Sequence, residues 1–217
     1  MLLSNAALAS HFRFGTITWT IPDPVGAPRT VRFVVTHGWA RGSESSVTLN
    51  FGDSTTFSGM GTSIGTGTDV AGAQYNTLQF TTTHTYAASA GNGPFTVFFA
   101  SCCRISGLTN GGDANFRVQT VVSLLPGNTG GPVTTAPAII SLSAGAVRTY
   151  LFPAFDPDFD PLTCRLGVMS ESGLPTGQDI PSVPAGGAQP TVAATTGGCP
   201  EASPHFFRLE FSAFDPR

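Results

Sequence analysis

The sequence predicts an all-β chain made of two tandem β-sandwich domains, joined by a short linker rich in Pro, Gly and Thr. Apolar and polar residues alternate in several segments, such as residues 11–21, and this period of two is typical of half-buried strands. No segment carries a sustained helical period. Residues 126–137 contain seven Pro, Gly or Asn residues and no charge, which is the composition of a linker. A length of 217 residues suits two domains of about 100 residues each.

The predicted boundaries follow these changes of composition. Residues 1–10 form either the remnant of a signal peptide, because Ala-Leu-Ala at residues 7–9 has the small-x-small form of a cleavage site, or a disordered terminus. The first domain covers residues 11–125, the linker residues 126–137, and the second domain residues 138–217.

Six strands are expected in the first domain. Residues 11–21 and 31–37 are expected to pair as a long hairpin, with Gly15 allowing a bulge in the first strand. Residues 55–72 are rich in Gly, Ser and Thr, which fits a mobile loop or an irregular edge. The other strands of this domain are residues 46–51, 75–84, 94–105 and 116–125.

The second domain is expected to begin with strands at residues 139–142 and 147–155 and to end with an alternating strand at residues 206–214. Between them, residues 170–204 are almost wholly Gly, Pro, Ser, Thr and Ala. So long an irregular stretch is unusual in a compact domain and indicates a surface role or modification.

The composition favours a secreted protein and argues against nucleic-acid binding. Charged residues make up 11% of the chain, against about 25% in an average soluble domain. Lys is absent and the net charge is −3, so no basic stripe is available for a phosphate backbone. No apolar run approaches the roughly 18 residues that span a membrane. No Asn-x-Ser/Thr sequon occurs, so any glycan would be attached to hydroxyl groups or modified proline.

Two motifs carry a resemblance to known extracellular families. Phe-Gly-Asp at residues 51–53, His-Thr-Tyr at residues 84–86 and Gly-Pro-Phe-Thr-Val at residues 93–97 resemble the pattern of polycystic-kidney-disease (PKD) domains. Residues 154–163, Ala-Phe-Asp-Pro-Asp-Phe-Asp-Pro-Leu-Thr, resemble the signature of cadherin-like repeats, and residues 211–216 echo it. Both resemblances imply Ig-like β-sandwiches in an extracellular protein, and neither implies catalytic activity.

The acidic turn is a candidate calcium site. Asp156, Asp158 and Asp160 offer the hard oxygen ligands that calcium requires, and cadherin-like repeats often hold calcium between or beside them. The alternative is a bent loop that turns the three carboxylates outward into water. No other cofactor is expected.

Four cysteines are compatible with one or two disulfides in an oxidising compartment. Cys164 and Cys199 are the candidate pair, which would staple the Pro/Gly-rich loop to its domain. A bond between the adjacent Cys102 and Cys103 is disfavoured, because consecutive Cα atoms lie about 3.8 Å apart whereas disulfides prefer about 4.4–6.8 Å. In one alternative, one of the two cysteines is a buried free thiol and the other forms a disulfide outside this pair. In the other alternative, the pair provides a link to another subunit.

An enzyme is not expected. The sequence has no nucleophile elbow, no His-Glu-x-x-His motif and no phosphate loop. Asp53 and His84 resemble an acid/base pair, but in the PKD-like pattern they are expected to serve the fold, with Asp53 bonding turn amides.

Two sets of residues are candidates for binding sugars or for carrying them. Trp19, Trp39 and Tyr75 are candidates for an aromatic platform, although the period-two neighbours of Trp19 favour core packing. Threonines near prolines are candidate O-glycosylation sites. The alternative is that these threonines belong to an ordinary linker and carry no sugar. These threonines are Thr134, Thr135, Thr191, Thr195 and Thr196.

The predicted function is that of a non-enzymatic secreted structural protein. We expect a subunit of an extracellular filament or surface layer, with candidate sites for O-glycosylation, that assembles with itself head to tail through its terminal strands. The alternative is a carbohydrate-binding or spacer module of a larger secreted enzyme or adhesin. The residues assigned to the assembly strands are Phe12, Phe14, Ile17, Trp19, Phe207, Leu209 and Phe211.

Overall fold

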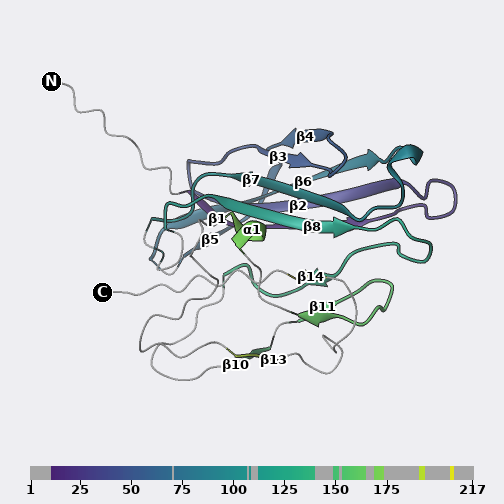
Figure 1. The fold of residues 1–217 in the computed structure, drawn as a ribbon. Coiled ribbons are helices and arrows are strands. Elements are labelled where there is room, and N and C mark those ends of the chain that lie inside the picture. The colour runs from purple at the N-terminus through teal and green to yellow at the C-terminus, as the bar shows by residue number, and fades with distance from the viewer. Residues whose placement is uncertain are drawn as a thin grey trace.

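The computed structural model describes residues 11–69, 71–106, 108, 112–139, 149–151, 153–164, 169–173, 191–193 and 206–207. Its largest part is a β-sandwich of two four-stranded sheets (Figure 1). The first sheet has the order β1-β2-β6-β5, and the second has the order β4-β3-β7-β8. The all-β fold class is therefore confirmed.

The first sheet is built on a long hairpin, as predicted. β1 (Phe12–Thr20) and β2 (Thr30–Ala40) pair antiparallel, and β6 (Gln74–Thr85) pairs along the whole of β2. The bulge of β1 falls between Phe12 and Phe14 and not at Gly15. Gly15 is needed for another reason, because a Cβ there would lie 2.6 Å from the Phe99 ring of the facing sheet.

The second sheet contains β3 (Val47–Asn50), β7 (Phe95–Ser101) and β8 (Phe116–Val122), near the predicted positions. Residues 55–72 form the irregular edge that was one of their two predicted states. They contain β4 (Thr56–Gly59) in the second sheet and β5 (Thr62–Thr68) in the first, so the chain changes sheets between them.

One apolar core lies between the sheets. β2 supplies it at every second position, with Val31, Phe33 and Val35 fully buried. Phe12 of β1 stacks on Phe116 of β8 with ring centroids 3.7 Å apart. Trp19, which is 2% exposed, donates from Nε1 to the Val121 carbonyl 3.0 Å away and so joins β1 to β8.

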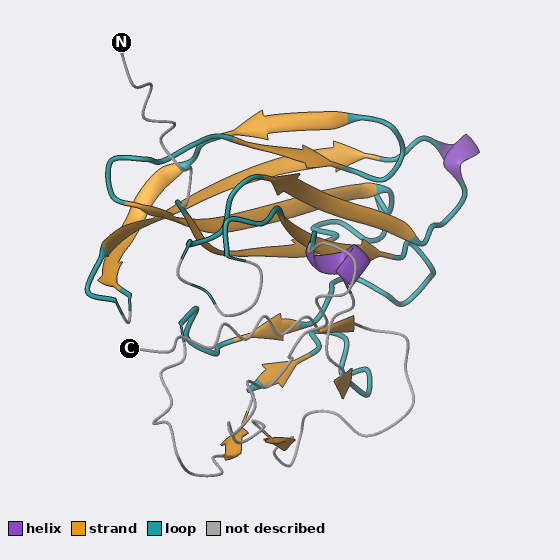
Figure 2. Cartoon of the chain, turned by 60° about the vertical axis from the view of Figure 1, so that its left-hand side comes forward, coloured by secondary structure: helices purple, strands orange, loops and turns teal. Residues whose placement is uncertain are grey.

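The later elements are short and lie along one side of the sandwich (Figure 2). β9 (Val133–Thr134) pairs antiparallel with β11 (Ala154–Phe155). β10 (Thr149–Leu151) pairs parallel with β13 (Thr191–Ala193), and β12 (Thr163–Cys164) pairs parallel with β14 (Phe206–Phe207). A 3-10 turn at Ala88–Ala90 and α1 (Met169–Ser172) complete the described elements. The predicted second sandwich and its boundary stay predictions.

Candidate functional site

The PKD-like motif residues come together at one end of the sandwich. Asp53 follows β3 and His84 lies near the end of β6, and Asp53 Oδ2 is 2.7 Å from His84 Nε2. Asp53 Oδ1 accepts hydrogen bonds from the Thr55 amide at 3.1 Å and from its hydroxyl at 2.6 Å. Burial by itself raises the pKa of Asp53, but the bonds from Thr55 and His84 outweigh it and lower the pKa below its ordinary value.

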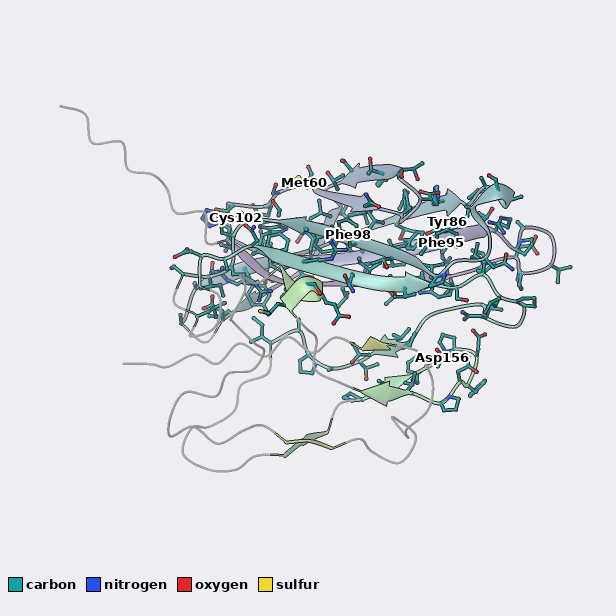
Figure 3. The ribbon with its side chains drawn as sticks, viewed as in Figure 1. Met60, Tyr86, Phe95, Phe98, Cys102 and Asp156 are labelled. Carbon is teal, nitrogen blue, oxygen red and sulfur yellow. A yellow bond between two sulfur atoms is a disulfide. The ribbon has the colours of Figure 1, made fainter. Side chains whose placement is uncertain are left out.

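Aromatic rings enclose this pair. Phe51 stacks on His84 with ring centroids 4.2 Å apart, and Tyr86 stacks on Phe95 at 4.1 Å. The Tyr86 hydroxyl donates to the Phe51 carbonyl at 2.9 Å, and burial, together with the charge of Asp53, raises the pKa of Tyr86. Figure 3 shows Tyr86 and Phe95 together at this end. We call Phe51, Asp53, His84, Tyr86 and Phe95 the aromatic knot. It joins the two sheets, and the bond from the Thr55 amide to Asp53 is the turn contact predicted for that residue.

A fully buried histidine, His37, was not predicted as a site residue. His37 continues the inward face of β2 and is 0% exposed. Trp39 Nε1 donates to His37 Nδ1 at 2.6 Å, so the neutral ring carries its proton on Nε2. Burial lowers the pKa of His37 to about 4, opposed in part by the Met60 backbone. The alternation of β2 could have revealed this position, since His37 falls in step with Val35 and Trp39.

The proposed sugar platform is wrong. Trp19 and Trp39 are 2% and 5% exposed, so both indole rings belong to the core. Tyr75 is half-buried, with its ring 5.7 Å from that of Phe14. The three rings therefore offer no shared flat surface to a sugar.

The acidic turn docks on the segment predicted to be a linker. The Asp158 carboxylate accepts hydrogen bonds from the Thr129 amide at 2.6 Å, from the Gly130 amide at 3.1 Å and from the Thr129 hydroxyl. Asp156 is 5% exposed and accepts from the Asp158 amide at 2.8 Å. Within the described part of the chain, no three His, Cys, Asp or Glu side chains are grouped to hold a metal. Asp156, Asp158 and Asp160 are thus not gathered here as ligands, and calcium binding stays a prediction.

The same linker segment pairs with β1. The Ile21 amide donates to the Thr129 carbonyl at 2.7 Å, and the Gly131 amide donates to the Trp19 carbonyl at 3.2 Å. At the other end of β1, the Phe12 amide donates to the Cys103 carbonyl at 3.2 Å. Both ends of β1 are therefore bonded within the chain.

These bonds hold the first of the two predicted assembly strands within its own chain. Phe12, Ile17 and Trp19 are buried in the core and Phe14 is half-buried, so β1 is an integral part of the sandwich. Of the C-terminal strand, Phe207 lies in β14, which pairs with β12. Leu209 and Phe211 lie outside the described residues.

Cys102 and Cys103 are bonded to each other, and the peptide bond between them is cis. The prediction against this bond was wrong, because it rested on the Cα spacing of a trans peptide. Cys164 is described only by its backbone in β12 and Cys199 lies outside the described residues, so their pairing stays a prediction.

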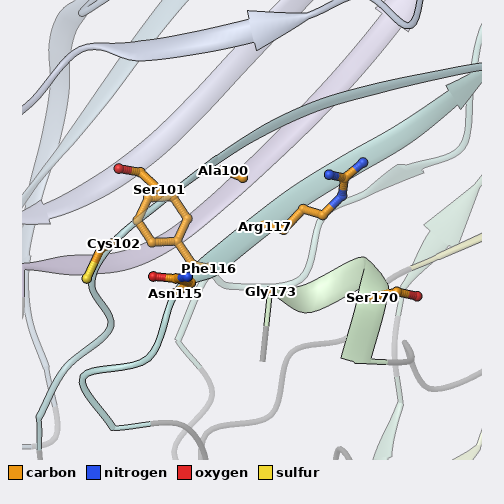
Figure 4. A pocket seen from close by; sticks show the side chains of 8 residues that line it. All are labelled: Ala100, Ser101, Cys102, Asn115, Phe116, Arg117, Ser170 and Gly173. Atoms are coloured by element: carbon orange, nitrogen blue, oxygen red, sulfur yellow. The ribbon is translucent and has the colours of Figure 1, made fainter. Parts of the chain in front are cut away.

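A pocket of about 450 Å³ lies beside Cys102, between β7, β8 and α1 (Figure 4). Its lining includes the side chains of Ser101, Asn115 and Ser170. The Arg117 guanidinium, also in the lining, lies 3.5 Å from the centroid of the Phe98 ring, and its Nε donates to Gln119. Burial lowers the pKa of Arg117. The pocket is open to solvent and its lining is more apolar than polar, and the Arg117 guanidinium already has partners within the chain.

The predicted glycosylation sites differ in their exposure and hydrogen bonding where the structure describes them. The Thr134 hydroxyl donates to the Pro153 carbonyl at 2.8 Å and accepts from the Ala136 amide at 3.0 Å, whereas Thr135 is exposed. Thr191 is described only by its backbone in β13, and Thr195 and Thr196 lie outside the described residues. O-glycosylation stays a prediction.

The edge formed by β4 and β5 is the most open part of the sandwich. Their residues are exposed except for Gly59 and Gly67, which are half-buried. Phe57, Met60 and Ile64 in this segment are 40%, 45% and 55% exposed. Residues 56–68 show no hydrophobic alternation, so this surface was not predicted. Among the described residues, no helix has the length and apolar character required to cross a membrane.

Comparison with known proteins places the sandwich in a family. The model described as "Integrin beta-like protein A-E, N-terminal" matches residues 13–125, which is 113 of the 217 residues. The chain belongs to this family. The matched region covers β1 to β8 and therefore includes both sheets, the aromatic knot and His37.

Two relatives of this integrin beta-like family come from Dictyostelium discoideum. Integrin beta-like protein A is 29% identical over 201 residues, covering 80% of this chain and 10% of the relative. Integrin beta-like protein C is 36% identical over 131 residues, covering 54% of this chain and 6% of the relative. The chain thus spans a tenth or less of each relative's length. No solved structure matches it. The match supports an extracellular β-rich protein, while the PKD-like and cadherin-like resemblances stay predictions.

Proposed function

We propose that this chain is an extracellular, non-catalytic β-sandwich module of a larger cell-surface protein, and that it works by contact with neighbouring molecules. Membership of the integrin beta-like N-terminal family carries the proposal. The name integrin beta-like, borne by both relatives, indicates a cell-surface adhesion setting. The small share of each relative that the chain covers favours one module among several.

The side chains that resemble catalytic groups support a non-catalytic role. The Asp53–His84 pair lies between rings, and the Thr55 hydroxyl beside it donates to Asp53 and not to His84. His37 is fully buried and neutral near pH 7. These groups stabilise the sandwich and present no reactive atom pair to a substrate.

Assembly into a filament or surface layer is the second candidate function. The predicted route through the terminal strand β1 would require Phe12 and Trp19 to leave the core and the bonds to residues 103 and 129–131 to break. The exposed β4–β5 edge favours direct contact between folded modules, which extends into a filament or layer only where a further contact joins the pairs.

Surface labelling and attachment test the main proposal. An antibody against the folded chain is expected to label intact cells of the source organism without permeabilisation. Cells that produce the parent protein without this module are expected to keep it at the surface but to attach less firmly. Labelling that appears only after permeabilisation, or attachment that does not change, would refute the proposal.

A further inference from the structure

We infer that β5 is an edge at which a second copy of this chain adds its own β5, forming a two-fold antiparallel ladder between modules. The inference rests on the proposed function of contact between modules and names the strand and the partner. It replaces the terminal strands of the sequence prediction with an internal strand.

Among the residues that the structure describes, none pairs with the outer side of β5. The strand Thr62–Thr68 pairs with β6 on one side, and in the described part of the chain no backbone hydrogen bond reaches its other side. Six of its seven residues are exposed. The remaining edges offer less, since β1 is bonded at both ends, β4 has four residues and β8 has no exposed residue.

The strand lacks most of the features that protect sheet edges. Natural edge strands are commonly protected by Lys, inward-pointing charges, Pro or bulges. β5 reads Thr-Ser-Ile-Gly-Thr-Gly-Thr and contains neither a charge nor a proline. Its one protective feature is the irregularity between Ser63 and Gly65, which leaves residues 65–68 in regular pairing with β6. Small side chains let another backbone approach closely.

A second copy fits this edge because the strand is complementary to itself. An antiparallel copy centred on Gly65 places Thr62 opposite Thr68 and Ile64 opposite Thr66. Cross-strand pairs of β-branched residues and threonines are favourable, and no like charges meet. A two-fold contact of this kind closes on itself and yields a dimer.

The residues around β5 would add apolar contact area between two copies and no repulsion between like charges. Phe57, Met60 and Ile64 expose apolar surface in the same segment, which a second copy would partly remove from water. Asp69 directly follows the strand, but it is paired with Arg13 at 3.0 Å, and both side chains are 5% exposed. The charge nearest in sequence is therefore compensated within each copy.

Sedimentation velocity of the full chain over a range of concentrations tests the inference. Thr66→Lys places a charge at the edge in each copy and is expected to raise the dimer dissociation constant at least tenfold. Thr96→Lys is the matched control, because Thr96 is an exposed threonine on β7, an inner strand of the other sheet. It is expected to leave the dissociation constant unchanged. A chain that stays monomeric at all concentrations would overturn the inference, as would equal dimerisation of both variants with unchanged circular dichroism.

Hydrogen exchange locates the contact independently of any variant. Backbone amides of residues 62–68 are expected to exchange more slowly as the dimer forms, while those of β7 do not change. Protection confined to another strand would contradict the assignment to β5. Failure here is separable from failure of the proposed function, because a monomeric chain that still labels the cell surface and supports attachment refutes only the pairing.

Discussion

Lowering the pH from 7 to 4 is expected to remove about 3 kcal/mol of folding stability through His37 alone. The ring is 0% exposed, and burial holds its pKa at about 4, against an ordinary value of 6.5. The unfolded chain takes up a proton below pH 6.5, whereas the folded chain does so only near pH 4. Stability therefore falls as the pH decreases through this window and levels off below it. At about 1.4 kcal/mol per pKa unit, the loss is about 3 kcal/mol.

Urea unfolding at pH 7, 5.5 and 4, compared between the chain and His37→Gln, measures this effect. Gln keeps a carbonyl acceptor for Trp39 Nε1 but does not titrate, so the variant is expected to be less stable at pH 7 and to lose less on acidification. The pKa of Asp53 is lowered from 3.8, so its contribution is present above that value and is lost only at lower pH, outside the window of His37. A difference in unfolding free energy between the two proteins that does not vary with pH would refute the reasoning.

Three further predictions concern single side chains. Asp53→Ala leaves the Thr55 amide and His84 without their acceptor and is expected to cost about 1–3 kcal/mol in thermal or urea denaturation; an unchanged melting temperature would contradict the structural role of the aromatic knot. Arg29 donates to the carbonyls of Tyr86, Ala87 and Gly91, so Arg29→Ala is expected to cost about 1 kcal/mol and to speed hydrogen exchange in residues 86–92. Asp158→Ala removes the acceptor of the residue 129 and 130 amides and is expected to speed proteolytic cleavage in residues 126–131. Cleavage at the original rate would show that this contact does not hold the segment.

The strands of the sandwich could be predicted where side chains alternate. In β2 the inward residues Val31, Phe33 and Val35 are strongly apolar and recur at every second position, and a strand was predicted at residues 31–37. β4 and β5 could not be assigned, because Gly, Ser and Thr on two exposed faces carry no such period. Their pairing with β3 and β6 depends on where the chain changes sheets, which local sequence does not encode.

The turn contact of Asp53 was predicted, whereas the ring stacking of the aromatic knot and the contacts of the acidic turn were not. Asp53 was expected to bond turn amides, and it accepts from the Thr55 amide. Asp158 instead bonds to residues 129 and 130, and this contact depends on how a later segment returns to the sandwich. Charge and spacing in the sequence indicated oxygen ligands but could not indicate which amides they would meet.

The pairing of residues 129–131 with β1 has a mechanical consequence. Tension applied between Phe12 and Gly131 acts along β1, because Gly131 is bonded to Trp19 near the far end of that strand. The hydrogen bonds between residues 19–21 and residues 129–131 lie across the direction of pull, so they resist it together and are loaded in shear. A module attached at these two points is expected to withstand more force than one pulled apart a single bond at a time.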